Sequence, residues 1–86
     1  MADQQLKPVS PGRVAAELRK LADGRKSGQF DADEYEHRFA RMISELRDRH
    51  IDGNRAEIFA ALTPLQKDGT LDAGAWERLT RSLGLA

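Results

Sequence analysis

Apolar residues recur at helical spacing through the middle of the chain, and this pattern restricts the fold more than any other feature of the sequence. They are Tyr35, Phe39, Met42, Ile43 and Leu46, at i, i+4, i+7, i+8 and i+11. This spacing places all five side chains on one face of a helix. With Asp31 as its N-cap, the segment is predicted to be helical from Ala32 to about Arg49. No segment alternates with period two for long enough to form a core strand, so we expect an all-α protein.

Three further segments carry the start and stop signals of helices. Each begins after a side chain of the type that caps a helix N-terminus, and these are Ser10, Asn54 and Asp72. Gly24 is expected to end the first helix and Gly84 the last, because glycine favours the left-handed conformation found at helix C-termini. The third helix is expected to end or kink near Thr63, where one further turn can start, because Pro64 has no N–H to donate.

The length and composition indicate one small domain. Of 86 residues, 40% are hydrophobic and 33% are charged, which suits a folded chain with a modest core. Residues 1–9 lack periodicity and are expected to be a flexible leader, and residues 10–86 a single helical domain. There is no cysteine, no apolar run of about 18 residues that could span a bilayer, and no secretory signal. A cytoplasmic setting is therefore expected.

The chain repeats itself at an offset of 41 residues, so that 26–32 aligns with 67–73. Each copy holds a glycine, an apolar residue and an aspartate cap, with an aromatic residue four positions after the cap. One helical hairpin cannot cover its own apolar face, whereas two can pack together. We therefore expect a compact four-helix bundle of two repeated helix-turn-helix hairpins, at about 10–50 and 51–86.

Within the first copy, short motifs are spaced as in a known family of hairpins. The motifs are Leu-x2-Leu, Gly-x-apolar-Asp, x2-Glu-aromatic and a closing apolar pair. Their residues are Leu18, Leu21, Gly28, Phe30, Asp31, Glu34, Tyr35, Met42 and Ile43. This pattern resembles the SHOCT family, the short C-terminal domains of bacterial proteins, and the second copy follows it except at Ala75 and Gly84. The resemblance implies a helical hairpin with an oligomerisation or docking role and no catalysis.

A weaker likeness is to a pair of EF-hands that bind no calcium. Asp23 to Glu34 has the twelve-residue length of an EF-hand loop, with Gly28 at position 6. The loop also needs an oxygen ligand at position 3, where this chain has Arg25. We expect no metal ion here, and a degenerate, calcium-responsive EF-hand-like module remains one alternative.

No pattern of catalytic residues stands out. The two histidines, His37 and His50, are thirteen residues apart with no cysteine, so we interpret them as surface or capping residues. None of the serines lies in a nucleophile elbow, and no glycine-rich phosphate loop is present. The chain is therefore predicted to be neither an enzyme nor a cofactor-binding protein, and no small-molecule substrate is expected.

Contact with nucleic acid is the main alternative function. The candidate residues are Arg19, Lys20, Arg38, Arg41 and Arg49. However, the 14 basic residues of the chain are balanced by 14 acidic ones, and the two signs interleave along the first two helices. An interleaved field attracts phosphate poorly, so a nucleic-acid-contacting regulator is the second hypothesis.

The leading hypothesis is a small non-catalytic module for protein–protein interaction or oligomerisation, an adaptor or regulator of bacterial type. It would dock a helix or apolar segment of a partner, or of a second copy, in an apolar groove. The residues predicted to line this groove, where the core leaves them uncovered, are Tyr35, Met42, Leu46, Phe59 and Trp76.

Overall fold

Four helices make up the part of the chain that the structure describes, residues 7–85 of a computed structural model. They are α1 (Pro11–Lys26), α2 (Ala32–Arg49), α3 (Arg55–Lys67) and α4 (Ala73–Ser82). Within these residues there is no strand, and a single isolated bridge joins Val9 to Ile51. The predicted all-α, four-helix architecture is confirmed. None of the described helices is both long enough and apolar enough to cross a membrane.

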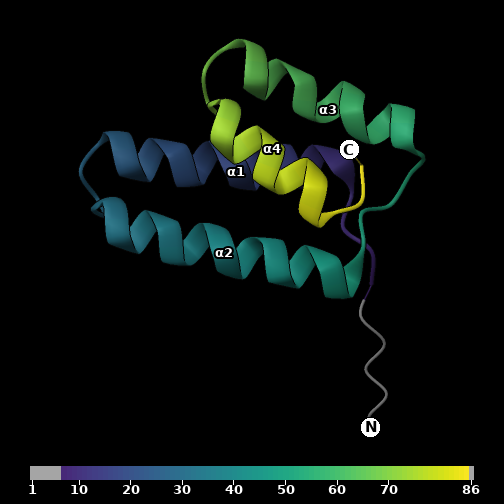
Figure 1. Ribbon diagram of the computed structural model, residues 1–86, viewed down its shortest axis with the longest axis horizontal. Coiled ribbons are helices and arrows are strands. Elements are labelled where there is room, and N and C mark those ends of the chain that lie inside the picture. The colour runs from purple at the N-terminus through teal and green to yellow at the C-terminus, as the bar shows by residue number, and fades with distance from the viewer. Residues whose placement is uncertain (1–6, 86) are drawn as a thin grey trace, which may run out of the picture.

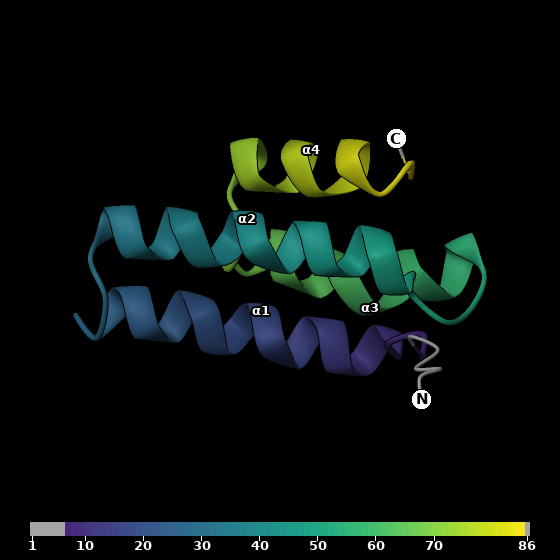
Figure 2. The ribbon, with the colours of Figure 1, turned by 90° about the horizontal axis from the view of Figure 1, so that it is seen from below.

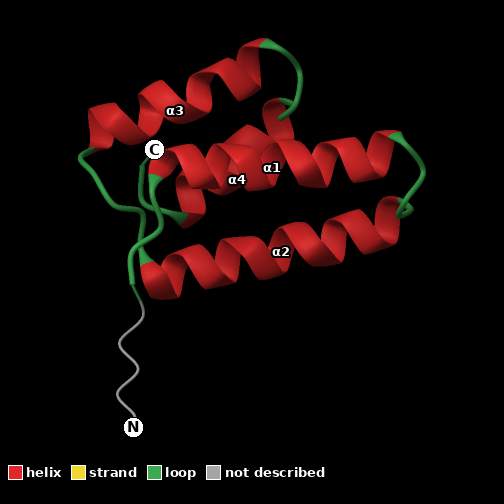
Figure 3. Ribbon diagram, turned by 180° about the vertical axis from the view of Figure 1, so that it is seen from behind, coloured by secondary structure: helices red, strands yellow, loops and turns green. Residues whose placement is uncertain are grey.

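The helices α1 and α2 form an antiparallel pair, and α3 and α4 cover one side of that pair. α3 packs on α1, and α4 packs on α2. Figure 1 shows α4 in front of α1, between α3 and α2. Seen from below, α2 lies at a level between those of α4 and α1 (Figure 2), and from behind α1 lies in front of α4 (Figure 3). The other side of the α1–α2 pair faces away from α3 and α4.

The core lies where the four helices meet. The helices supply ten of its buried apolar residues, namely Val14, Leu18, Leu21, Phe39, Ile43, Leu46, Ile58, Leu62, Leu65 and Leu79. Val9, Leu71 and Leu85 join them from the segments between and beyond the helices. The apolar face predicted for the second helix is confirmed by the burial of Phe39, Ile43 and Leu46. Burying one such leucine or phenylalanine side chain stabilises the fold by about 1.5–3 kcal/mol.

All four predicted N-caps are present. The capping side chain accepts a hydrogen bond from the backbone N–H three residues later, from Arg13 to Ser10 at 3.2 Å, Glu34 to Asp31 at 2.9 Å, Glu57 to Asn54 at 2.8 Å and Ala75 to Asp72 at 2.8 Å. In α3 the Glu57 side chain also accepts from the Asn54 N–H, which completes a capping box. These local bonds explain why the helix starts follow the sequence signals closely.

Gly24 does not end α1, contrary to the sequence prediction, because its role is to make room for an aromatic ring. The helix continues to Lys26, and the chain turns at Gly28, where φ is +84°. Gly24 is buried, and a Cβ added there would stand 2.3 Å from Cζ of Phe30. The Gln29 N–H donates to the Gly24 carbonyl at 2.8 Å, which closes a Schellman turn.

The prediction that the third helix ends or kinks near Thr63 is also wrong. α3 runs through Pro64 to Lys67, and no further helix starts there. Leu62 and Leu65, on either side of the proline, are both fully buried, and this packing holds the helix together across one missing hydrogen bond. The carbonyl that loses its donor to Pro64 is that of Ala60, four residues earlier, and the Thr63 hydroxyl adds a bond to the neighbouring Phe59 carbonyl at 2.6 Å.

The predicted flexible leader, residues 1–9, needs a correction at its C-terminal end. Residues 1–6 lie outside the described residues, but 7–9 pack against the α2–α3 connection. Val9 is buried; its N–H donates to the His50 carbonyl at 3.0 Å, and its carbonyl accepts from the Asp52 N–H at 2.8 Å. The folded unit therefore extends at least three residues further toward the N-terminus than the periodicity indicated.

The two interhelical turns share their backbone geometry. Gly28 and Gly69 have φ of +84° and +85°, and each is followed by an aspartate that caps the next helix. The Phe30 and Leu71 N–H groups donate back to Gly24 and Leu65, the matching carbonyls of the preceding helices. Equal turns are compatible with two copies of one unit, and the duplication itself stays a prediction.

We expect Gly24→Ala to lower the free energy of unfolding by about 1 kcal/mol or more, because the new methyl group displaces the Phe30 ring. The urea midpoint measures this. In a Phe30→Ala background the same change should be neutral or stabilising, since alanine is the better helix former. Gly12→Ala, at an open position of α1, is the matched control and should stabilise. Equal effects at Gly12 and Gly24 would contradict the close packing of Phe30.

Replacing His50 with glycine should make the folded protein more stable. It has φ +69° and ψ 154°, a backbone conformation that costs a side-chain-bearing residue about 1–3 kcal/mol. Because His50 is exposed, His50→Gly removes this strain with little loss of packing and should raise the free energy of unfolding by about 1 kcal/mol. Ser44→Gly, in the exposed middle of α2, is the control and should lower it by about 1 kcal/mol. A lower urea midpoint for both variants would exclude strain at His50.

Candidate interaction groove

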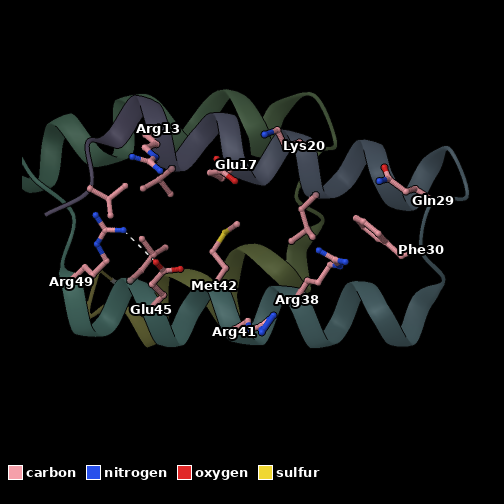
Figure 4. Close-up of a pocket in the computed structure, with 14 residues that line it drawn as sticks. Arg13, Glu17, Lys20, Gln29, Phe30, Arg38, Arg41, Met42, Glu45 and Arg49 are labelled. Atoms are coloured by element: carbon pink, nitrogen blue, oxygen red, sulfur yellow. Dashed lines mark hydrogen bonds and ion pairs between the residues drawn. The ribbon is translucent and has the colours of Figure 1, made fainter. Parts of the chain in front are cut away.

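A groove of about 430 Å³ runs between α1 and α2. It opens on the side of the pair that faces away from α3 and α4, which lie behind it in Figure 4. One end is at Val9, before α1, and the other is at Gln29 and Phe30, in the turn between the helices. The groove thus follows nearly the whole length of α1. The turn that closes one end and the backbone bonds of Val9 at the other fix how the two helices lie.

The floor of the groove is apolar. Its residues are Val9, Val14, Leu21, Phe30, Met42 and Leu46. Four of these six belong to the buried core, while Met42 and Phe30 are only half-buried. In Figure 4 the Met42 side chain points from α2 toward α1, near the middle of the groove. The apolar surface that a ligand could reach is therefore centred on Met42 and Phe30.

The rims of the groove are charged. On α1 they carry Arg13, Glu17 and Lys20, and on α2 they carry Arg38, Arg41, Glu45 and Arg49. Five cations against two carboxylates give a local net charge of +3, although the whole chain is formally neutral. Spacings of three and four residues place each set on one ridge of its helix. The groove therefore offers an electropositive border around a short apolar floor.

Two of the rim arginines are held by partners of their own helix. Arg38 Nε lies 3.0 Å from Glu34 Oε2, and its guanidinium covers the Phe30 ring at 4.7 Å. Arg49 Nη1 lies 3.3 Å from Glu45 Oε2, and its Nε donates to the Lys7 carbonyl at 2.9 Å. Both ion pairs join residues four positions apart on α2, which are neighbours on the surface of a helix.

The structure separates the candidate nucleic-acid residues into two groups. Four of them, Lys20, Arg38, Arg41 and Arg49, line the groove. Arg19 lies elsewhere, because its Nη1 is 2.8 Å from Asp68 Oδ2 and 3.4 Å from Thr70 Oγ1, in the α3–α4 turn. Neighbouring helical residues point about 100° apart, so Arg19 and Lys20 cannot share one face. Arg13 and Glu17 were missed, although their spacing of seven and three residues from Lys20 was a usable signal.

The predicted docking residues do not form one surface. Met42 and Leu46 are in the groove, where the core covers Leu46 to 4% exposure. Phe59 and Trp76 pack on each other with ring centroids 6.0 Å apart and join α3 to α4. Tyr35 stacks on Phe39, also at 6.0 Å, and burial raises the pKa of its phenol. Of the five residues, Met42 alone offers an accessible apolar side chain in the groove.

The acidic residues of the described chain form no metal centre. No three His, Asp or Glu side chains within residues 7–85 are grouped so that they could hold a metal ion. In the EF-hand-like segment, Glu34 pairs with Arg38 and Asp31 caps α2, so both carboxylates have structural partners.

A second hollow, of about 390 Å³, lies where the C-terminal ends of α2 and α4 meet. It is lined by Leu46, Arg47, His50, Ile51, Ile58, Ser82, Leu83, Gly84 and Leu85. It carries two basic or titratable side chains, Arg47 and His50, and lacks the charged ridges of the first groove. We therefore take the α1–α2 groove as the candidate site.

The Arg19–Asp68 contact predicts an unusual titration. The side chain and N–H of Thr70, and then Arg19, lower the pKa of Asp68 to about 2 from its ordinary 3.8. A carboxyl with a lowered folded-state pKa stabilises the fold above pH 4, and this contribution is lost as the pH falls from about 4 to about 2. An NMR titration should find the Asp68 midpoint near 2, and Thr70→Val should raise it. A wild-type midpoint near 3.8 would refute the contacts of Asp68 with Thr70 and Arg19.

No protein-family model, no curated protein and no solved structure matches this chain. The likeness to SHOCT hairpins therefore remains a resemblance of short motifs, and so does the weaker likeness to an EF-hand pair. The α1–α2 groove, with its apolar floor and cationic rims, is the basis on which a function can be argued.

Proposed function

We propose that the protein is a non-catalytic protein–protein interaction module, an adaptor or regulator that docks a helix or apolar segment of a partner protein. The docking site is the groove between α1 and α2. The observation that carries the proposal is the half-buried state of Met42 and Phe30 in a groove that α3 and α4 leave open. Apolar side chains in a groove between two helices are the usual seat of an amphipathic helix.

The shape of the groove supports this function. Two antiparallel helices leave a trough in which a third helix can pack against both. The 16 residues of α1 give a trough about 24 Å long, at about 1.5 Å per residue. A partner helix of about four turns would fill it and would place one apolar residue over Met42.

A second copy of the chain is a poor occupant of this groove. Docking two copies through the same face would bring together two sets of rims, each with a local charge of +3. Like charges in contact oppose association, and the floor offers little apolar area to offset the repulsion. The proposed partner is therefore a different protein.

Contact with nucleic acid is the second candidate function, because four of the five predicted basic residues line one groove together with Arg13. Against it, Glu17 and Glu45 lie on the same rims, and Arg38 and Arg49 already pair with glutamates. A phosphate backbone laid along the groove would meet both signs of charge.

A defined peptide tests the proposal. The probe is a 16-residue helix with a leucine stripe and glutamine elsewhere, titrated into ¹⁵N-labelled protein. We expect shifts of the amide signals at Val14, Leu21 and Met42. Met42→Lys should weaken binding about tenfold, because it places a charge in the apolar centre of the groove. Ala40→Lys, on an exposed face of the same helix, is the control and should bind normally.

The proposal fails if neither this peptide nor its charged analogues shift the groove amides at millimolar concentration. Shifts centred on Phe59 and Trp76 would also refute it, because they would move the docking site to α3 and α4.

A further inference from the structure

We infer that the natural occupant of the α1–α2 groove is an acidic amphipathic helix, with carboxylates on both flanks of its apolar stripe. This inference rests on the proposed function and adds the chemistry of the partner. Both walls of the groove carry cations, Arg13 and Lys20 on α1 and three arginines on α2. A helix seated on Met42 must therefore present negative charge to both sides.

The charges along the groove are ordered in bands. Figure 4 shows Arg13 opposite Arg49 near one end, and Lys20 opposite Arg38 toward the other. The two rim carboxylates, one on each helix, and Arg41 lie between these bands, near Met42. Carboxylates outnumber cations in this middle part, so a partner that fits this order carries its acidic residues toward its two ends.

The spacing of the bands sets a register. Arg13 and Lys20 are seven positions apart on α1, which is about 10 Å along the helix axis. A partner helix that runs along the groove would meet Arg13 and Lys20 with carboxylates two turns apart, at i and i+7, on the flank that faces α1. On α2, Arg38 and Arg49 are eleven positions apart, so the other flank would carry its carboxylates about three turns apart. This requirement distinguishes the inferred partner from a peptide that is merely acidic.

Several of the cations are placed to receive carboxylates. Arg38 and Arg49 are oriented by Glu34 and Glu45, and a guanidinium has five N–H donors, so each keeps donors for a partner. Arg13, Lys20 and Arg41 are exposed and form no ion pair with any residue between 7 and 85. A partner carboxylate would add a charge-assisted hydrogen bond to these three side chains without breaking an ion pair among residues 7–85.

An acidic helix fits these features better than a nucleic acid does. A helix uses the apolar floor as well as the rims, whereas a phosphate backbone uses the cations alone. Base stacking would need an accessible aromatic face, and the guanidinium of Arg38 already lies over one face of the Phe30 ring, the one aromatic ring that lines the groove among the described residues. The central glutamates would repel phosphate but would face no charge in a partner of the inferred pattern.

Peptides of one length and one leucine stripe test the inference. Four 16-residue helices carry, on the flank that faces α1, glutamate at i and i+7, glutamate displaced beside the central leucine, glutamine, or lysine. Fluorescence anisotropy in 50 and 300 mM NaCl measures their affinities. We expect the i, i+7 glutamate peptide to bind about tenfold or more tighter than the other three, with the advantage reduced at high salt.

A pair of charge reversals locates the effect. Lys20→Glu in the groove should weaken binding of the i, i+7 glutamate peptide about tenfold and strengthen binding of the lysine peptide. Lys67→Glu, at the exposed end of α3, makes the same change in net charge and should leave both affinities unaltered. Circular dichroism melts of both variants verify that the proteins compared are folded.

The outcomes separate the two proposals. If none of the peptides binds, the docking function fails and the inference fails with it. If the glutamine or lysine peptide binds as tightly as the i, i+7 glutamate peptide, docking stands and the acidic partner is refuted. Equal binding of the two glutamate peptides overturns the inferred register. A 16-nucleotide single strand that displaces the glutamate peptide with higher affinity would overturn the inference in favour of nucleic acid.

Discussion

The contact between the Phe30 ring and the backbone of Gly24 determines how α1 and α2 lie against each other. The ring occupies the space that a Cβ at position 24 would fill, so the turn can bring the start of α2 close to the end of α1. The same ring closes one end of the groove and supports the guanidinium of Arg38 on its other face. Since α3 packs on α1 and α4 on α2, the position of both follows from this pair.

A second set of contacts fixes the opposite end of the groove. Val9 exchanges backbone hydrogen bonds with the α2–α3 connection, and Arg49 donates to the Lys7 carbonyl. His50 adopts a backbone conformation suited to glycine, and its carbonyl accepts the Val9 N–H. The hydrogen bond that holds Val9 to the end of α2 is therefore accompanied by backbone strain at His50. Both ends of the groove are closed by segments that flank α1 and α2, and no residue of α3 or α4 lines it.

The features that the sequence predicted well depend on neighbouring residues. Each N-cap involves a side chain and a backbone N–H three positions away, and all four are present. The errors arose where a distant residue overrides the local preference. Gly24 stays helical because Phe30 needs the space, and Pro64 stays helical because Leu62 and Leu65 are held in the core. No local signal could place Val9 in that core, because its partners are some forty positions away.

The site was harder to predict because it depends on the direction in which each side chain points. Composition could name Arg19 and Lys20 together, but only the packing of α1 shows that one pairs with Asp68 while the other lines the groove. Two of the aromatic residues predicted to bind a partner, Phe59 and Trp76, pack on each other and join α3 to α4. Met42 could be named because it belongs to the apolar stripe of α2, between the core residues Phe39 and Ile43.

The formal net charge of zero does not show where the acidic and basic side chains lie in the structure. Many carboxylates have structural partners: Asp31 and Asp72 cap helices, and Asp68, Glu36 and Glu77 pair with arginines outside the groove. A carboxylate paired at a distance contributes little to the field in the groove, because charges further apart than about 8–10 Å are screened at physiological ionic strength. The cations of α1 and α2 that remain on the rims are offset there by Glu17 and Glu45, and by Glu34, which pairs with Arg38. A chain of zero net charge can therefore present a strongly positive binding surface, and the balance of residues along the sequence is a poor guide to the charge of its partner.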